Sequence, residues 1–351
     1  MKWNEFFSEL SQGDIRQVYL FTGAEDFVKR EALNKLRGAI LPAGLEALNE
    51  TVMEGADAGR IVEAAETLPM MCDRRLVVVR DWAPLMSGKS SDEEAETRRI
   101  LDWMSVKNDG CTLVFYMRQE ADARKKLTSE LNKRGCTVNF DQLTDPEIVR
   151  WVSARLKPSG KKMSSAAIQR LVFTAGRELT RLDVELSKLA AYSGERAAID
   201  ETDIEAVVSP SLEYGAFDML NHLFDGDAQG AYRLLELMLE RGSNRIAIIA
   251  SIARQLRGMS FTAIASENGH SVDETARQLG LNQYAAKVMA QKARRYSAAA
   301  LEEMYIAAID TDYAIKSGQM RDSAALDRLF IKISALPAKN TQPDKRRPRQ
   351  R

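Results

Sequence analysis

Five short apolar segments in the first 141 residues are separated by enough chain for a helix between each pair. These candidate strands are residues 18–21, 50–53, 75–80, 112–117 and 137–140. They are apolar rather than alternating, which is typical of strands buried on both faces. Parallel strands need crossover connections, and residues 26–37, 58–67 and 93–106 have helical patterns. We therefore predict a parallel α/β domain over residues 1–141.

Beyond this domain the strand signal stops and the pattern becomes helical. The candidate helices are residues 145–156, 164–175, 179–193, 228–241, 245–266 and 298–317, with a short helix or turn at 199–208. In the 228–241 segment the apolar residues form one stripe at helical spacing. The sequence predicts an α/β plus all-α protein, with a small helical domain over 142–211 and a larger one over 212–337.

The last fourteen residues, 338–351, differ from the rest of the chain in charge. They carry six basic residues against Asp344, although the formal charge of the whole chain is zero. The segment lacks apolar periodicity and contains prolines, so we predict a basic, disordered tail. The remaining chain is then net acidic, which argues against general nucleic-acid binding by its surface.

Composition places the chain among ordinary globular proteins, with 45% apolar and 28% charged residues. It has no run of about 18 apolar residues that could span a membrane, and its N-terminus lacks the apolar segment of a secretory signal. Cys72, Cys111 and Cys136 are widely spaced and suit reduced, mostly buried thiols. We expect a cytoplasmic protein that binds neither a membrane nor a metal ion.

Two adjacent methionines, Met70 and Met71, lie between a candidate helix and the strand at 75–80. Pro69 cannot continue the helix, so the pair falls in a turn, where polar residues are usual. One interpretation is that both side chains fold back over the core of the protein. The other is that they remain exposed and enter a pocket on a partner, for which a flexible thioether is suited.

The turn after the first strand has the position of a phosphate-binding loop, because it joins a strand to a helix N-terminus. It contains one glycine, Gly23, and no Lys-Ser or Lys-Thr pair. Glu25 and Asp26 occupy the place of a phosphate, and their carboxylates would repel it. This turn is not expected to bind a nucleoside triphosphate.

Residues Ala83–Ser90, APLMSGKS, match a relaxed phosphate-loop pattern after an apolar strand. The leading glycine is missing, and Pro84 lacks one of the N–H donors that a phosphate cradle needs. We favour a loop before the next helix, and a nucleotide hydrolase using this segment remains the alternative.

Residues 271–295 resemble a helix-turn-helix, with Ala276 and Gly280 at a familiar spacing and several basic residues in the second helix. Helix packing is the favoured interpretation, and a DNA-binding regulator is a further alternative. Catalytic chemistry has little support, because His222 and His270 have no obvious carboxylate or nucleophile partner in the sequence.

Several segments, in one order, resemble the delta subunit of bacterial DNA polymerase III, the clamp-opening part of the clamp loader. They are VYLFTGAEDF (18–27), TLPMMCDRRLVVVRD (67–81), LTRLDVELSKLAAYSG (179–194), FDMLNHLFDGDAQGAYRLLELMLERG (217–242) and IDTDYAIKSG (309–318). The resemblance covers about residues 15–336 and implies an AAA+-like α/β module, a small helical lid and a helical collar that oligomerises.

The resemblance also implies a non-catalytic chain without a cofactor, inside the DNA polymerase III holoenzyme, a DNA-directed DNA polymerase. Neighbouring motor subunits would handle ATP. The implied partners are the sliding clamp (beta), the tau/gamma and delta-prime subunits through the collar, and primer–template DNA within the complex.

In the family, a hydrophobic pair before the third strand inserts into a pocket on the ring-shaped clamp. Matched by position, this pair is Met70 and Met71, with Leu68 and Pro69 shaping the approach. The family more often has an aromatic residue or leucine there. Arg74 is expected either to contact the rim of the clamp pocket or to pair with Asp73.

Overall fold

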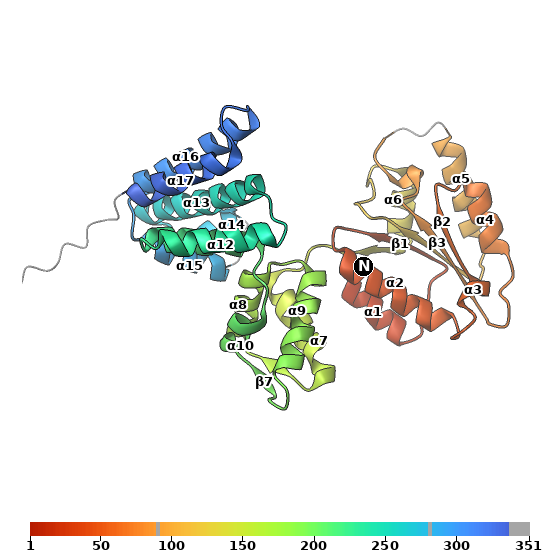
Figure 1. Cartoon of the computed structure of the whole chain (residues 1–351). Helices are drawn as coiled ribbons and strands as arrows, with labels where there is room; N and C mark the ends of the chain where they lie inside the picture. Colours follow the sequence, from red (N-terminus) through yellow and green to blue (C-terminus); the bar gives the residue numbers. More distant parts are fainter. Residues whose placement is uncertain (89–91, 280–282, 337–351) are drawn as a thin grey trace, which may run out of the picture. The chain divides into compact units, whose positions relative to one another are not determined.

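The computed structural model describes residues 1–88, 92–279 and 283–336, and the chain divides into two compact units (Figure 1). The first unit is Met1–Thr144 and the second begins at Asp145. This boundary lies three residues beyond the predicted end of the α/β domain. The predicted tail, 338–351, lies outside the described residues.

The first unit is built on a five-stranded parallel sheet of order β2-β3-β4-β1-β5. The strands are β1 (Val18–Thr22), β2 (Glu50–Glu54), β3 (Arg75–Arg80), β4 (Cys111–Tyr116) and β5 (Thr137–Asn139). All five predicted strands are confirmed to within one residue or two at their ends. β1, β3 and β4 are almost wholly buried, which explains their continuous apolar sequences.

Helices cover both faces of this sheet (Figure 1). They are α1 (Trp3–Ser11), α2 (Asp26–Ile40), α3 (Glu46–Asn49), α4 (Ala58–Glu66), α5 (Glu93–Ser105) and α6 (Lys126–Lys133), with a 3-10 turn η1 (Ala83–Leu85). On one face, α4, α5 and α6 pack on alternate strand residues such as Val77 and Phe115. On the other, Phe6 of α1 packs edge-on against Tyr19 and Phe21 of β1. The sequence patterns missed α1, α3 and α6.

The second unit begins with a small group of helices. They are α7 (Asp145–Leu156), α8 (Ser165–Ala175), α9 (Leu179–Tyr192) and α10 (Glu201–Val207), with a 3-10 turn η2 (Lys157–Ser159). The prediction that no strand follows the first domain was wrong, because β6 (Lys162–Met163) pairs in parallel with β7 (Ala198–Ile199). Two residues per strand are too few to produce a periodic signal.

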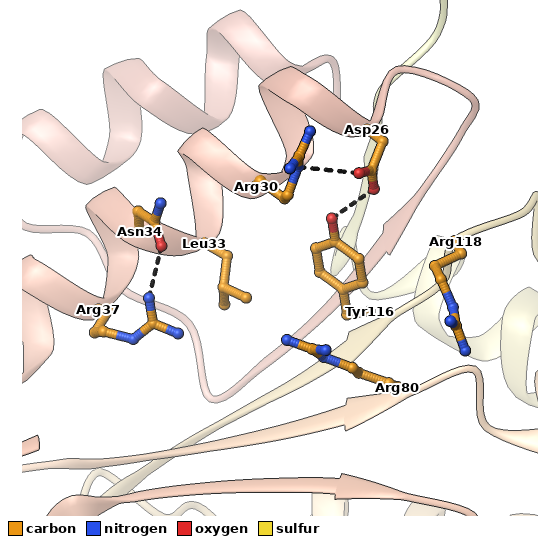
Figure 2. Close-up of a pocket in the computed structure, with 8 residues that line it drawn as sticks. All are labelled: Asp26, Arg30, Leu33, Asn34, Arg37, Arg80, Tyr116 and Arg118. Carbon is orange, nitrogen blue, oxygen red and sulfur yellow. Dashed lines mark hydrogen bonds and ion pairs between the residues drawn. The ribbon is translucent and has the colours of Figure 1, made fainter. Parts of the chain in front are cut away.

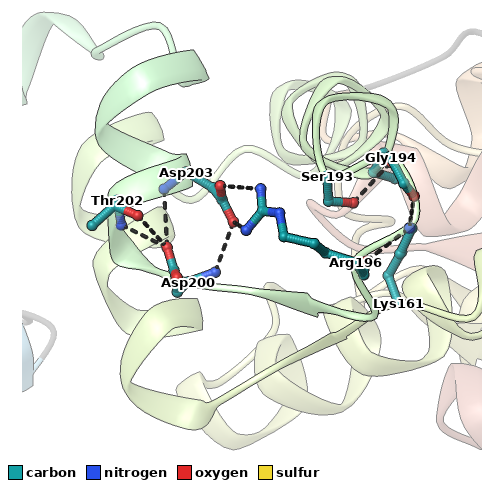
Figure 3. Close-up of polar contacts among 8 residues, drawn as sticks. Lys161, Ser193, Gly194, Arg196, Asp200, Thr202 and Asp203 are labelled. Carbon is teal, nitrogen blue, oxygen red and sulfur yellow. Dashed lines mark hydrogen bonds and ion pairs between the residues drawn. The ribbon is translucent and has the colours of Figure 1, made fainter.

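Polar contacts fix the chain around this short β pair (Figure 3). Asp203 is buried and accepts hydrogen bonds from both terminal nitrogens of Arg196, at 2.6 and 3.1 Å. This guanidinium lowers the pKa of Asp203. Asp200 caps α10 by accepting from the N–H groups of Thr202 and Asp203. Lys161 donates to the carbonyls of Gly194 and Arg196, which ties the loop after α9 to β6.

The rest of the second unit is a helical bundle around α13. Its helices are α11 (Leu212–Phe224), α12 (Ala228–Glu240), α13 (Arg245–Glu267), α14 (Val272–Leu279), α15 (Gln283–Ala293), α16 (Ala298–Lys316) and α17 (Asp322–Ala335). α13 contacts α11, α14, α15, α16 and α17, so it is buried on most sides. Phe173 of α8 packs edge-on against Tyr214 and Phe217 of α11.

The predicted fold class is confirmed in its main features: a parallel α/β module is followed by a part that is helical apart from the short β6–β7 pair. The division of the helical part into a domain at 142–211 and another at 212–337 stays a prediction. Cys111 and Cys136 are buried and Cys72 is half-buried, and all three are free thiols as expected. Among the described residues, no helix is long and apolar enough to cross a membrane.

Candidate functional site

The loop between α4 and β3 presents three large apolar side chains to solvent. Leu68 is 81% exposed, Met70 55% and Met71 83%. The two methionines therefore do not fold back over the core, which was the first interpretation of the sequence. Burial of such side chains by a partner would be favourable, so the loop has the character of an apolar contact site.

A buried asparagine fixes the backbone of this loop. Asn49, at the end of α3, is fully buried. Its Oδ1 accepts from the Met70 N–H at 2.7 Å, and its Nδ2 donates to the Met70 carbonyl at 2.9 Å. The same Nδ2 also donates to the carbonyl of Leu45 at 3.1 Å. The Met70 backbone is thus held at both its polar groups, while its side chain remains outside.

Sequence reasoning missed Asn49 because 21 residues separate it from Met70. An isolated asparagine at the end of a short helix has no local pattern that marks a contact with a distant loop. The loop itself has one unusual backbone angle, since Met71 has φ of +60°. Left-handed backbone is uncommon for a residue with a side chain, and the contacts around it must hold it there.

Arg74 lies at the end of the loop and is engaged within the protein. Its Nε donates to the carbonyl of Asp109 at 2.8 Å, and its Nη1 donates to the carbonyl of Ile15 at 2.9 Å. Neither partner is Asp73, which was the pairing considered from the sequence. These contacts join the loop to the segments that precede β1 and β4. The guanidinium thus positions the loop, and a contact between Arg74 and a clamp stays a prediction.

The turn after β1 does not offer a phosphate cradle. Gly23 has φ of +115°, and a Cβ there would lie 2.4 Å from the carbonyl oxygen of Phe140. The N–H of Glu25 donates to that same oxygen at 2.8 Å, and the N–H of Phe27 donates to the Glu25 carboxylate at 3.3 Å. Two N–H groups that could have faced a phosphate are therefore already used.

Lys29 of α2 is a buried cation that the sequence analysis did not single out. Its ammonium donates to the carbonyls of Gly23 at 2.7 Å and Met117 at 2.6 Å. Burial lowers the pKa of Lys29. The side chain closes the turn by joining it to the end of β4, and does not face an open phosphate site.

The segment at 83–90 also lacks the form of a phosphate loop where the structure describes it. Pro84 and Leu85 are buried. The N–H groups of Leu85 and Met86 donate to carbonyls one turn back, within η1. Lys89 and Ser90 lie outside the described residues. The described part is a 3-10 turn that continues the core.

The region of the helix-turn-helix pattern is used for packing. Ala286, Met289 and Ala293 of α15 are buried, and α15 contacts α13 and α8. Arg295, one of the basic residues considered for DNA, pairs with Asp225. Gly280 of the turn lies outside the described residues. The structure thus favours the packing interpretation.

One of the two histidines differs from the expectation. His222 does have a carboxylate partner, since its Nδ1 lies 2.8 Å from Oδ2 of Asp227. The other oxygen of Asp227 accepts from the N–H of Gly230 and caps α12. Asp227 therefore has a structural role as the N-cap of α12, and among the described residues no hydroxyl or thiol is hydrogen-bonded to the His222 ring.

Comparison with known proteins agrees with this architecture. A family model for the DNA polymerase III delta subunit matches residues 19–141, and a model for its C-terminal domain matches residues 213–333. Together these models match more than half of the chain. The DNA polymerase III subunit delta of Bacillus subtilis is 24% identical over 93% of this chain and 95% of its own length.

More distant relatives and a solved structure point the same way. The DNA polymerase III subunit delta of Escherichia coli is 19% identical over 71% of each chain. The solved DNA clamp loader delta protein of Bacillus subtilis has a TM-score of 0.61 at 22% identity and covers 95% of this chain and 99% of its own. The fold is therefore that of a clamp-loader subunit. The chain belongs to the DNA polymerase III delta subunit family.

Replacing Asn49 with leucine should loosen the methionine loop, because both polar groups of the Met70 backbone lose their partner. We expect the free energy of unfolding to fall by about 2 kcal/mol and the Met70 amide to exchange faster with solvent. Urea unfolding and hydrogen exchange measure these two effects. Asn132→Leu, at an exposed position on α6, is the matched control. Unchanged exchange at Met70 in Asn49→Leu would contradict the role assigned to Asn49.

Replacing Lys29 with methionine should change how stability depends on pH. The folded protein releases the Lys29 proton below the ordinary lysine pKa of about 10.4, so the unfolded chain binds more protons between the two pKa values. The free energy of unfolding of the wild type should therefore rise with pH in that interval, relative to Lys29→Met. Urea unfolding followed by tryptophan fluorescence tests this, and parallel pH profiles for the two proteins would refute it.

Proposed function

We propose that this delta-family chain binds the sliding clamp through the loop of Leu68, Pro69, Met70 and Met71. The observation that carries the proposal is an exposed apolar pair on a backbone held from inside by Asn49 and Arg74. A loop that is ordered before binding loses less conformational entropy when it docks. An apolar pocket on the clamp is the matching partner surface.

The proposed action is to open the ring, or to hold it open, for loading onto primed DNA during replication. The chain performs no covalent chemistry in this role. It binds one clamp subunit more tightly in a geometry that is compatible with an open interface. That difference in affinity shifts the equilibrium between closed and open rings. ATP-driven steps belong to neighbouring subunits of the loader.

The helical bundle is proposed to join the other loader subunits. α16 carries Ile306, Ile309 and Tyr313 at helical spacing, with exposed fractions of 49%, 45% and 65%. An apolar stripe on an exposed helix is suited to pack against helices of a neighbouring subunit. Through this collar the chain would join tau/gamma and delta-prime, and it would meet primer–template DNA only inside the complex.

Replacing Met70 and Met71 together with serine should weaken binding to the sliding clamp. Burial of two methionine side chains contributes at least about 2 kcal/mol, so the dissociation constant should rise roughly 30-fold or more. Isothermal titration calorimetry with the clamp of the same organism measures this change. The serine hydroxyls are tolerated at exposed loop positions, so the fold should be retained.

Met86→Ser is the matched control, because Met86 is an exposed methionine of the same unit outside the loop. It should bind the clamp as tightly as the wild type. Equal clamp affinity of the double variant and the wild type would refute the site. Equal loss of clamp affinity in the double variant and in Met86→Ser would also count against the assignment of the site to the methionine loop.

A further inference from the structure

A concave site lies on the α2 face of the sheet, with a cavity of about 350 Å³. Its lining residues come from α2, from the end of β3 and from the end of β4 and the residues after it (Figure 2). They are Asp26, Arg30, Leu33, Asn34, Arg37, Arg80, Tyr116 and Arg118. Half of these residues are arginines, which is unusual for a pocket floored by apolar side chains.

Register and helical spacing explain why these arginines meet. Arg80 and Tyr116 are the last residues of β3 and β4 and are paired across the parallel ladder, so their side chains share one face. On α2, Asp26, Arg30 and Arg37 follow one another at helical spacings and face the same groove. Tyr116 donates to Asp26 at 2.7 Å, which joins the two walls.

Three of the four arginines already have carboxylate partners. Arg30 pairs with Asp26 at 3.0 Å, Arg37 pairs with Glu50 at 2.7 Å, and Arg118 pairs with Glu54 and Asp81. Arg80 differs. Within the described part of the chain, its guanidinium has no acceptor and no ion-pair partner, and it points across the pocket toward Leu33 and Arg37 (Figure 2).

Arg37 retains hydrogen-bonding capacity on the opposite wall. A guanidinium has five N–H donors. Its contacts with Glu50 and Asn34 occupy Nε and one hydrogen on each terminal nitrogen, which leaves two N–H groups. An anion between Arg80 and Arg37 would thus find hydrogen-bond donors on two sides. It would also supply the negatively charged partner that the Arg80 guanidinium does not have within the described part of the chain.

We propose that this pocket binds a phosphate group, with Arg80 as its principal ligand and Arg37 as the second. A tetrahedral phosphate has oxygens that point in several directions and can accept from two guanidinium groups on opposite walls. A carboxylate has two oxygens in one plane and matches one guanidinium fork better. The floor of Leu33 and Tyr116, each 5% exposed, leaves room for an apolar part of the ligand.

The pocket shares Asp26 with the turn after β1, but the Asp26 carboxylate is already paired with Arg30 and accepts a hydrogen bond from Tyr116, so its charge is partly neutralised. The pocket is separate from the methionine loop. It therefore does not depend on the proposed clamp binding. The phosphate could come from a free small molecule or from the backbone of a nucleic acid. Inorganic phosphate and the dinucleoside monophosphate thymidylyl-thymidine represent these two sources, and the second has one phosphodiester without the many contacts of a long strand.

Isothermal titration calorimetry of the full chain with each probe, at low salt, tests the proposal. We expect binding of at least one probe by the wild type and an affinity lower by about tenfold or more in Arg80→Gln. Arg80→Lys keeps the charge without the fork and should lie between the two. Arg98→Gln is the control, since Arg98 is an exposed arginine of α5 outside the pocket. Circular dichroism establishes that Arg80→Gln is folded.

The probe whose binding depends on Arg80 identifies the source of the phosphate, a free small molecule or a nucleic-acid backbone. Arg80-dependent binding of either probe supports the site. The proposal fails when neither probe binds the wild type, or when folded Arg80→Gln binds as tightly as the wild type. It also fails when Arg98→Gln weakens binding equally. Arg80-dependent binding of a glutamate-rich peptide, without binding of either phosphate probe, would replace the phosphate by an acidic protein segment.

Discussion

The burial of the central strands on both faces is the constraint on which the first unit depends. Loss of the helices from either face would expose the continuous apolar sequences of β1, β3 and β4. Strand order and register are therefore fixed together. The positions of both ends of β3 are fixed as a result. The methionine loop leads into its first residue, Arg75, and Arg80 is its last residue. Six residues of strand span about 20 Å, so one rigid element carries both candidate sites at opposite edges of the sheet.

Contacts at the edge of the same sheet explain why the turn after β1 does not offer a phosphate cradle. Phosphate cradles depend on backbone N–H groups that are left free at a strand-to-helix turn. Here the N–H of Glu25 donates to Phe140, and Lys29 is drawn inward to two carbonyls. The turn is closed by its own contacts. The cations available to an outside ligand lie instead along α2 and at the end of β3.

The strands, their parallel direction and the position of Met70 and Met71 in a turn could be predicted because each depends on local pattern. Whether the two side chains are exposed could not be decided from that pattern, and the sequence left both interpretations open. Buried strands have apolar runs, and a proline before two methionines marks a turn. β6 and β7 could not be predicted, since two residues carry no period. Asn49 and Arg80 could not be assigned roles either, because their importance depends on which distant residues the register brings near. Long-range contacts of single polar side chains leave no periodic signal in a sequence.

The methionine loop combines an ordered backbone with flexible side chains, and these two properties act differently on binding. Asn49 and Arg74 fix the backbone before a partner arrives, which reduces the entropy lost on docking. Each methionine still has three rotatable bonds to order, which limits the affinity that its apolar surface can supply. In the proposed function, a subunit that releases its clamp after loading would benefit from this balance, because a tighter contact would slow dissociation. Two methionines therefore suit reversible contact better than a larger rigid side chain would.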